Sequence, residues 1–506
     1  MISCTHSVAF AGINVLKISI EVQLTKGLPS FTIVGLGDKA IAESRERVRS
    51  ALHAIGLSLP ANHITVNLAP ADVLKEGTHY DLPIAIALMG AMGVLDPDSI
   101  FNYIMMGELG LDGTIRPVSG ILPASVAATG YDMGFICPKE QGSEALWSGN
   151  NTIVAPHNLL DLLNHLKGSQ SLPPPQPFSP QNAETSALLD MKDIKGQESA
   201  KRALEIAAVG GHNLLMMGPP GSGKSMLAAR LPSILPPLST LEMLEVSKIH
   251  SVAGLLKDGQ LVTTRPFRAP HYNASTPAMV GGGLKAKPGE ISLAHRGVLF
   301  LDELPEFSRQ TLEALRQPLE TGEVSVARAN SHITYPARFQ FVAAMNPCRC
   351  GYLGIPGHEC SRAPRCAQEY QSKISGPLLD RIDIQIEVPL INPWQLGQIQ
   401  SGEDSATILA RVLKAKEFQG DRFKNLPIST NAEADGRILE QIAHLTDEAR
   451  LQLIHVAEQL HLSGRGFHRM IRVARTIADM DQSDEILKVH MDEALSFRKS
   501  CAKGEF

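Results

Sequence analysis

One octapeptide, residues 218–225, constrains this chain more than any other feature. It fits the phosphate-binding pattern G-x-x-x-x-G-K-[ST]. A short buried strand is expected before it over Asn213–Met217, and a helix after it from Met226 to Leu231. Glycines let the backbone approach an anion, and the first amides of the helix point at it, so this order predicts a nucleotide site. The predicted phosphate-binding residues are Gly218, Pro219, Pro220, Gly221, Ser222, Gly223, Lys224 and Ser225.

The lysine and serine of this motif have specific expected roles. We expect Lys224 to contact the β- and γ-phosphates of ATP and the Ser225 hydroxyl to hold Mg²⁺. Two later apolar runs read as buried parallel strands that end in polar residues. The first, residues 298–301, ends at Asp302, expected to bind Mg²⁺ through water, and Glu303, expected to polarise the attacking water. The second, residues 339–345, ends at Asn346, which would position the same water. The alternative is that both runs are ordinary core strands with no role in catalysis. The order of the two runs after the phosphate-binding loop disfavours this alternative.

Composition limits the remaining possibilities. The chain has 506 residues, 43% hydrophobic residues and a net charge of −5, as expected of a globular protein with two or three domains. A slightly negative net charge does not indicate nucleic-acid binding, so any DNA site must be a local positive surface. The N-terminus has no basic stretch typical of a signal peptide, and the longest apolar run, Leu82–Leu95, is too short to span a bilayer. We therefore expect a cytoplasmic protein with no membrane partner.

Cysteine usage predicts a metal site. Four of the seven cysteines lie close together in a loop rich in glycine and proline. Four thiolates suit tetrahedral Zn²⁺, and clustering suits a reducing compartment better than a disulfide framework. Unligated thiols remain the alternative. A closed shell of four sulfur ligands would make this zinc structural rather than catalytic. The predicted ligands are Cys348, Cys350, Cys360 and Cys366.

The chain divides into four segments. Residues 1–167 mix strands, expected over 13–22 and 64–68, with helices expected over 39–55 and 81–92. The first helix carries Arg45, Arg47 and Arg49, which are candidate DNA contacts. Residues 168–190 form a Pro- and Ser-rich linker, 191–392 the nucleotide-binding core, and 393–506 a polar helical region.

Two insertions and several arginines in the core and the helical region also bear on function. Glycine-rich residues 281–289 carry Lys285 and Lys287, and residues 322–338 read as a hairpin with Arg328 at its tip. A plain solvated hairpin is the alternative for the second. Arg381 lies in a Leu-Leu-Asp-Arg-Ile-Asp segment, and Arg465 opens a helix that could aim it at the γ-phosphate. The later Arg475 is expected on an exposed face of that helix.

Together these motifs resemble the AAA+ ATPases, most closely their magnesium-chelatase-like and MCM branch. The whole chain resembles the ComM/YifB family of bacterial proteins. This resemblance implies an α/β fold, with an AAA+ P-loop core and a helical lid domain. A Lon-protease-like α+β domain, of the ribosomal S5 domain 2-like type, would precede the core. The Lon-like stretches are 75–85, 106–109 and 113–120. The catalytic serine of Lon falls at Asp81 or Leu82, and its lysine near Leu122, so no proteolysis is expected.

The resemblance also assigns roles and partners. Asn346 would be sensor one, Arg381 an arginine finger reaching a neighbouring subunit, and Arg465 sensor two, with Arg469 the weaker choice. The implied assembly is a homo-hexamer that moves single-stranded and branched DNA, by branch migration in natural transformation or homologous recombination, with possible recombinase pathway partners. Lys285, Lys287 and Arg328 would contact DNA phosphates in its pore. Two alternatives stay open, a magnesium-chelatase-type motor and an ATP-dependent switch that moves nothing. A fused chelatase partner domain is disfavoured, because residues 481–485 break its D-x-S-x-S pattern.

Overall fold

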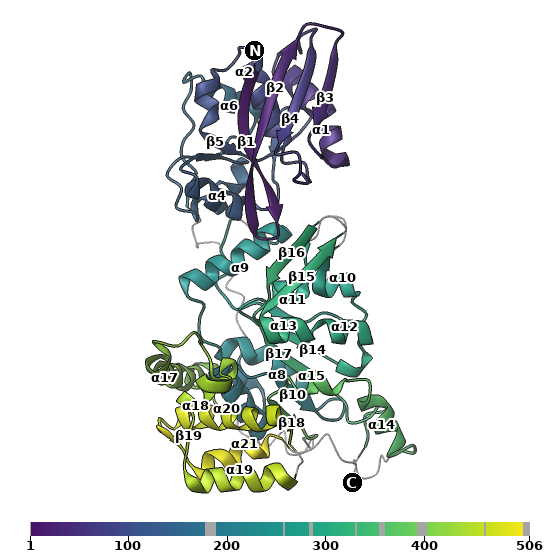
Figure 1. The fold of residues 1–506 in the computed structure, drawn as a ribbon, viewed down its shortest axis with the longest axis vertical. Helices are drawn as coiled ribbons and strands as arrows, with labels where there is room; N and C mark the ends of the chain where they lie inside the picture. Colours follow the sequence, from purple (N-terminus) through teal and green to yellow (C-terminus); the bar gives the residue numbers. More distant parts are fainter. Residues whose placement is uncertain are drawn as a thin grey trace.

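The computed structural model describes residues 2–177, 189–256, 259–282, 287–328, 331–353, 360–391, 402–459 and 462–498. The molecule is elongated, with an N-terminal sheet unit at one end of its long axis and the nucleotide-binding core below it (Figure 1). The C-terminal helices pack against the side and base of that core. Within the described ranges, no helix combines the length and apolar character needed to cross a membrane.

The N-terminal unit is built on a seven-stranded mixed sheet, ordered β3-β4-β2-β1-β5-β8-β9. The expected strands over 13–22 and 64–68 and the helices from 39 and 81 are confirmed. Helix α2 is buried at every position against β1 and β2, because after Asp81 its residues are apolar on all sides. The strands are β1 (Ile2–Ala11), β2 (Asn14–Thr25), β3 (Ser30–Val34), β4 (His63–Ala69), β5 (Tyr103–Met105), β8 (Gly134–Ile136) and β9 (Ile153–Val154). The helices are α1 (Lys39–Ala54), α2 (Asp81–Ala91), α3 (Pro97–Phe101), α4 (Ile121–Gly130), α5 (Gly142–Leu146) and α6 (Leu159–Leu166), with a small β6 (Glu108–Leu109)–β7 (Ile115–Arg116) ladder.

The core is a five-stranded, all-parallel sheet ordered β11-β14-β17-β10-β18. Every residue of β10, β14 and β17 is buried, as expected when both faces of a parallel sheet are covered. All three strands predicted around the nucleotide site are therefore confirmed. The strands are β10 (Leu214–Met217), β11 (Phe267–Arg268), β14 (Val298–Leu301), β17 (Gln340–Met345) and β18 (Ile384–Glu387), and helices α7 (Glu198–Gly210) and α8 (Lys224–Arg230) flank β10 in the sequence.

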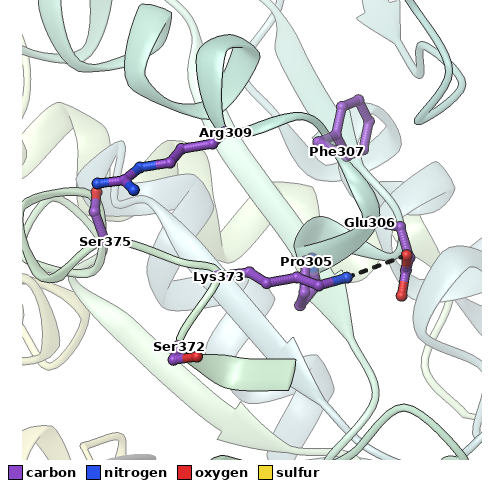
Figure 2. A pocket seen from close by; sticks show the side chains of 7 residues that line it. All are labelled: Pro305, Glu306, Phe307, Arg309, Ser372, Lys373 and Ser375. Carbon is purple, nitrogen blue, oxygen red and sulfur yellow. Dashed lines mark hydrogen bonds and ion pairs between the residues drawn. The ribbon is translucent and has the colours of Figure 1, made fainter. Parts of the chain in front are cut away.

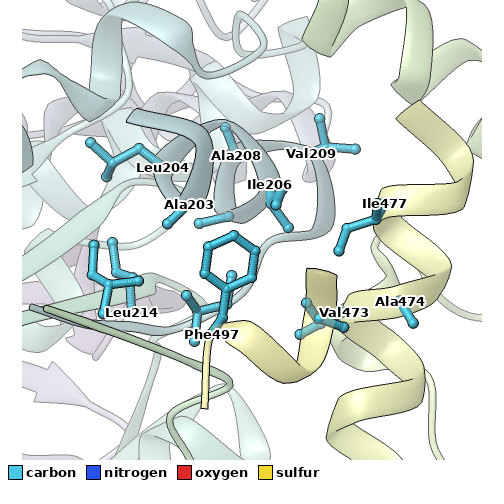
Figure 3. Close-up of a cluster of buried hydrophobic side chains, with 14 of the residues drawn as sticks. Ala203, Leu204, Ile206, Ala208, Val209, Leu214, Val473, Ala474, Ile477 and Phe497 are labelled. Atoms are coloured by element: carbon cyan, nitrogen blue, oxygen red, sulfur yellow. The ribbon is translucent and has the colours of Figure 1, made fainter. Parts of the chain in front are cut away.

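The C-terminal region is helical, and its helix α20 packs against α7 of the core. Figure 3 shows this contact, where Ile206 and Val209 of α7 face Val473 and Ile477 of α20. The expectation for Arg475 is wrong: it is 0% exposed and donates to Asp479 Oδ1 at 2.9 Å. Helix α20 packs on the core, so the turn that carries Arg475 is not exposed to solvent. The elements are α17 (Ser405–Phe423), α18 (Gly436–Ile442), β19 (His444–Leu445), α19 (Asp447–Gln459), α20 (Gly464–Met480), β20 (Glu485–Ile486) and α21 (Lys488–Ser496).

Helix α9 (Thr240–Ala253) and the hairpin insertion of the core contact the N-terminal unit. Helix α9 and the hairpin β15 (Glu323–Arg328)–β16 (Ser331–Pro336) lie between that unit and the parallel sheet (Figure 1). The backbone N–H of Gly120 donates to the carbonyl of Ser251 at 3.0 Å. The turn between β1 and β2 abuts β16, where Ile13 packs on a cluster that includes Tyr335.

Candidate active site

The phosphate-binding loop connects β10 to α8 with the backbone that the motif requires. Gly221 and Gly223 have φ angles of +76° and +90°, a region that glycine adopts without strain. The N–H of Gly218 donates to the carbonyl of Met345 at 3.2 Å, which ties the loop to the end of β17. The sequence therefore forms a glycine cradle at the carboxyl end of the sheet, where ligands of such sheets bind.

The Lys224 side chain lies within this loop. Its Nζ donates to the carbonyls of Gly218 and Pro219, both at 2.8 Å, and to Asn346 Oδ1 at 3.4 Å. Burial lowers the pKa of Lys224, while the nearby Asp302 and Glu303 oppose that shift. The ammonium group thus sits where phosphate oxygens can replace carbonyl partners.

The acidic residues expected from the β14 strand lie beside the loop. The Ser225 hydroxyl donates to Asp302 Oδ2 at 2.6 Å, and the N–H of Glu303 donates to Asp302 Oδ1 at 2.9 Å. Hydroxyl and carboxylate oxygens are the ligands that Mg²⁺ prefers. These residues therefore fit a nucleotide with its magnesium ion, and the exposed Glu303 carboxylate is free to approach a water molecule.

Tyr370 is a residue of this site that no sequence motif marked. It lies on α14 (Arg365–Gln371), is 3% exposed, and its hydroxyl interacts with the backbone of Asn346. Burial raises the pKa of Tyr370, and the carboxylates of Glu306, Glu303 and Asp302 add to the shift. The neighbouring Gln371 donates to the carbonyl of Pro347 at 2.9 Å. Helix α14 therefore holds the end of β17 in place.

The four predicted metal ligands come together next to this helix. Their sulfur atoms all lie within 4.8 Å of one another, and those of Cys348 and Cys350 are 3.1 Å apart. Cys348 is buried and Cys350 exposed, while Cys360 and Cys366 are half-buried. This group could hold a metal ion, and four soft sulfur donors suit Zn²⁺.

Arg381 lies at the opposite end of the sheet from the phosphate-binding loop. The Asn213 side chain, which precedes β10, donates to the Arg381 carbonyl at 2.8 Å, whereas the loop follows β10. At about 3.3 Å per residue, the four residues of β10 separate these ends by roughly 13 Å. The Arg381 guanidinium instead donates to Glu320 Oε2 at 2.6 Å. Arg381 therefore does not serve the nucleotide site of its own chain.

Arg465 lies on the same side as Arg381, not at the loop of its own chain. Both line an open groove of about 1000 Å³ between the amino ends of the core strands and the C-terminal helices. Arg465 is exposed, whereas Arg469 is buried near Asp380, at 3.7 Å, and Asp383, at 3.9 Å. The structure thus brings the two predicted arginines together and separates both from the chain's own phosphate-binding loop.

The candidate DNA-contacting residues are only partly described. Lys285 lies outside the described residues, while Lys287 is exposed on β13 (Lys287–Pro288), which pairs with β12 (Gly281–Gly282). Arg328 ends strand β15 of the expected hairpin, whose two strands are confirmed. A Cβ atom on Gly281 would lie 3.4 Å from Cγ2 of Val326 in β15, so the two insertions are side by side.

The arginines of helix α1 are engaged within the N-terminal unit. Arg47 Nε lies 2.5 Å from Oδ2 of Asp81, which is 0% exposed, so this candidate DNA contact is engaged in an internal ion pair. Asp81 needs this partner, because burial raises its carboxyl pKa and Arg47 opposes the shift. Arg45 and Arg49 both pair with Glu46, at 3.1 and 3.4 Å.

A smaller groove of about 500 Å³ lies after the Asp302–Glu303 segment, between η5 (Leu304–Glu306) and the residues that follow α14. In Figure 2, Lys373 and Glu306 point toward each other, 3.4 Å apart. This ion pair is a second tie between the α14 region and the segment that carries Glu303.

Comparison with known proteins places the chain in a family. Three family models match successive parts: "Subunit ChlI of Mg-chelatase" over residues 20–141, "Magnesium chelatase, subunit ChlI" over 190–396, and "Magnesium chelatase, subunit ChlI C-terminal" over 402–498. The chain is 45% identical over 500 residues to YifB of Escherichia coli (strain K12), covering 98% of this chain and 97% of that protein. It is 44% identical over 502 residues to competence protein ComM of Haemophilus influenzae, with the same coverage.

A more distant similarity links the chain to a chelatase subunit. The magnesium-chelatase 38 kDa subunit of Rhodobacter capsulatus is 30% identical over 186 residues, which cover 33% of this chain and 53% of that protein. The near-complete coverage by YifB and ComM is therefore the stronger finding. This chain belongs to the ComM/YifB family, within the magnesium-chelatase-like AAA+ proteins.

Proposed function

We propose that this chain is the subunit of a hexameric, ATP-hydrolysing motor that drives branch migration of DNA during natural transformation or homologous recombination. One observation carries the ring proposal: the phosphate-binding loop and the two candidate arginines lie at opposite ends of the same sheet. A site split in this way is completed when the arginine end of one subunit faces the loop end of the next. Head-to-tail contacts of this kind form a ring when the rotation between successive subunits closes.

In each composite site, the residues of this chain have separate roles. Lys224 and the loop amides bind phosphates, Ser225 and Asp302 hold Mg²⁺, and Glu303 with Asn346 orients water. Arg381 and Arg465 of the adjacent subunit would neutralise charge that develops on the γ-phosphate. Family membership supports ATP hydrolysis, since AAA+ proteins are ATPases.

DNA would be held by the two adjoining insertions. Lys285, Lys287 and Arg328 carry positive charge on a chain whose net charge is −5, so sixfold repetition around a pore would concentrate that charge. The name of the ComM relative supports a role in competence. We further propose that the four cysteines hold structural Zn²⁺, that the N-terminal unit is a Lon-like domain without proteolysis, and that the C-terminal helices form the lid.

The decisive experiment mixes two inactive variants. Lys224→Ala removes the loop lysine and Arg381→Ala removes the candidate finger, which elsewhere contributes about 10³-fold or more to turnover. Mixed rings contain some sites with both residues intact, so ATPase activity should return on mixing and should rise with single-stranded or branched DNA. Mixtures that co-assemble and yet stay inactive would exclude a shared site.

A magnesium-chelatase-type motor is the second candidate, favoured by the three chelatase family models. It predicts association with porphyrin-metallating enzymes and ATPase activity that does not respond to DNA. Measuring the ATPase rate with branched DNA, and capture of partners from cell extract on the tagged protein, separates the two candidates.

A further inference from the structure

The cysteine cluster lies directly against the nucleotide site. Cys348 is two residues beyond Asn346, whose side chain accepts from Lys224 Nζ at 3.4 Å. Strand β17, which ends at Met345, also receives the hydrogen bond that anchors the phosphate-binding loop. The first pair of thiols is therefore attached to the strand that supports both the loop and Asn346.

The cluster also touches the loop itself through Gly351. A Cβ atom on this glycine would lie 2.6 Å from Cδ and 2.7 Å from Cγ of Pro220, closer than real side chains pack. Gly351 has φ +86°, and its N–H donates to the carbonyl of Cys348 at 2.9 Å. The turn that holds the first two thiols thus supports one side of the phosphate-binding loop.

The other two thiols belong to helix α14 and the segment just before it. Cys366 lies in α14 and Cys360 shortly before it, and Gln371 at the end of α14 donates to the carbonyl of Pro347, next to Asn346, at 2.9 Å. A single ion bound to all four sulfur atoms would cross-link α14 to the end of β17. Such a link restrains both segments, because metal coordination fixes ligand positions within tenths of an ångström.

We propose that a thiolate-bound divalent metal of the zinc class braces the phosphate-binding loop, so that nucleotide binding depends on this metal as well as on the loop. The proposal rests on the proposed ATP binding at residues 218–225. Without the metal, the loop would hold its binding conformation for only part of the time. Apparent affinity then falls by that fraction, so a tenth of the population means a roughly tenfold weaker complex.

The first test removes the ligands at and just before α14. Full-length Cys360→Ser/Cys366→Ser protein should contain no zinc by elemental analysis, against about one per chain in the wild type. It should bind a fluorescent ATP analogue roughly tenfold more weakly, and its loop amides should exchange hydrogen faster. Wild-type affinity and exchange in the metal-free variant would overturn the proposal, as would a wild-type protein that binds no metal.

A second variant keeps the metal and breaks only the contact. Gly351→Ala should retain zinc and lose nucleotide affinity, because its Cβ displaces Pro220. Gly149→Ala is the matched control, since Gly149 has a similar φ of +72° and a Cβ added there would have no neighbouring atom within 4 Å. Unchanged affinity in Gly351→Ala would overturn the coupling. Absence of nucleotide binding in the zinc-loaded wild type would instead refute the proposed function.

Discussion

Replacement of Glu144 should loosen the contact between the N-terminal unit and the core, because its buried carboxylate accepts a hydrogen bond that crosses this contact. Glu144 Oε1 accepts from the Ser251 hydroxyl at 2.6 Å and from the backbone N–H of Leu122 at 3.1 Å. Glu144 is 5% exposed, and Ser251 lies in the last turn of helix α9 of the core. Glu144→Ala leaves the Leu122 N–H with only a 3.3 Å contact to Ser251 Oγ.

The size of the effect follows from these contacts. A hydrogen bond to a charged acceptor contributes about 1.5–3 kcal/mol. Only the bond from Ser251 crosses the contact, because Leu122 belongs to the N-terminal unit itself. Burial raises the pKa of Glu144, and this penalty on the charged form offsets part of the gain. We therefore expect a net loss of about 1–2 kcal/mol of docking free energy. This corresponds to roughly 5- to 30-fold more frequent opening.

Hydrogen exchange of residues 118–124 reports this opening, because the Gly120 N–H is bonded to Ser251 across the contact. Glu144→Gln is the matched control, since its amide oxygen can keep both bonds. Exchange should accelerate in Glu144→Ala and stay near the wild-type rate in Glu144→Gln. Equal exchange in all three proteins, or equal acceleration in both variants, would refute the assignment.

Glu144 also makes docking of the N-terminal unit depend on pH, and the direction of this dependence follows from its raised pKa. The raised pKa of Glu144 means that the docked state holds its proton more tightly than the free state. Its contribution is therefore greatest below the ordinary carboxyl pKa and declines as the pH rises through the raised value. Wild-type docking should weaken over that interval relative to Glu144→Gln, as measured by exchange at several pH values corrected for intrinsic rates.

Three further changes test the site and its surroundings. Glu303→Gln should bind ATP and fail to hydrolyse it, measured by nucleotide binding beside phosphate release. Replacing Lys285, Lys287 and Arg328 with alanine should spare basal ATPase, flatten the salt dependence of DNA binding and stop branch migration; migration at the wild-type rate would place the DNA path elsewhere. Arg475→Ala should destabilise the fold by about 3–5 kcal/mol, because it removes a buried partner of the buried Asp479 carboxylate, and denaturant unfolding measures this loss.

Local pattern was sufficient to predict the elements that carry the nucleotide site. The octapeptide and the apolar runs before it and before Asp302 fix strand, loop and helix through neighbouring residues alone, and the structure has them within a residue or two. The clustering of the four cysteines was also predictable, because thiols so near in sequence have few arrangements that keep them apart.

What sequence reasoning missed depends on contacts between distant segments. Tyr370 enters the site because α14 folds back on the end of β17, and nothing in its neighbourhood marks that contact. The burial of Arg475 and the side on which Arg465 lies follow from how α20 docks on α7. Ser251 and Glu144 are 107 positions apart, so their bond could not be read from either stretch.

The Glu144 contact also bears on whether the N-terminal unit takes part in the ATPase cycle. Helix α9, which Glu144 holds at its end, carries Glu245, and Glu245 Oε2 lies 3.0 Å from Nε of Arg296. Arg296 precedes strand β14, which leads directly to Asp302. Packed elements therefore run without a break from the N-terminal unit to the carboxylate of Asp302. Spatial continuity alone does not prove coupling.

A coupled unit predicts that Glu144→Ala changes ATP turnover as well as exchange, while Glu144→Gln changes neither. If Glu144→Ala opens the contact and turnover stays at the wild-type rate, the N-terminal unit is a passive attachment.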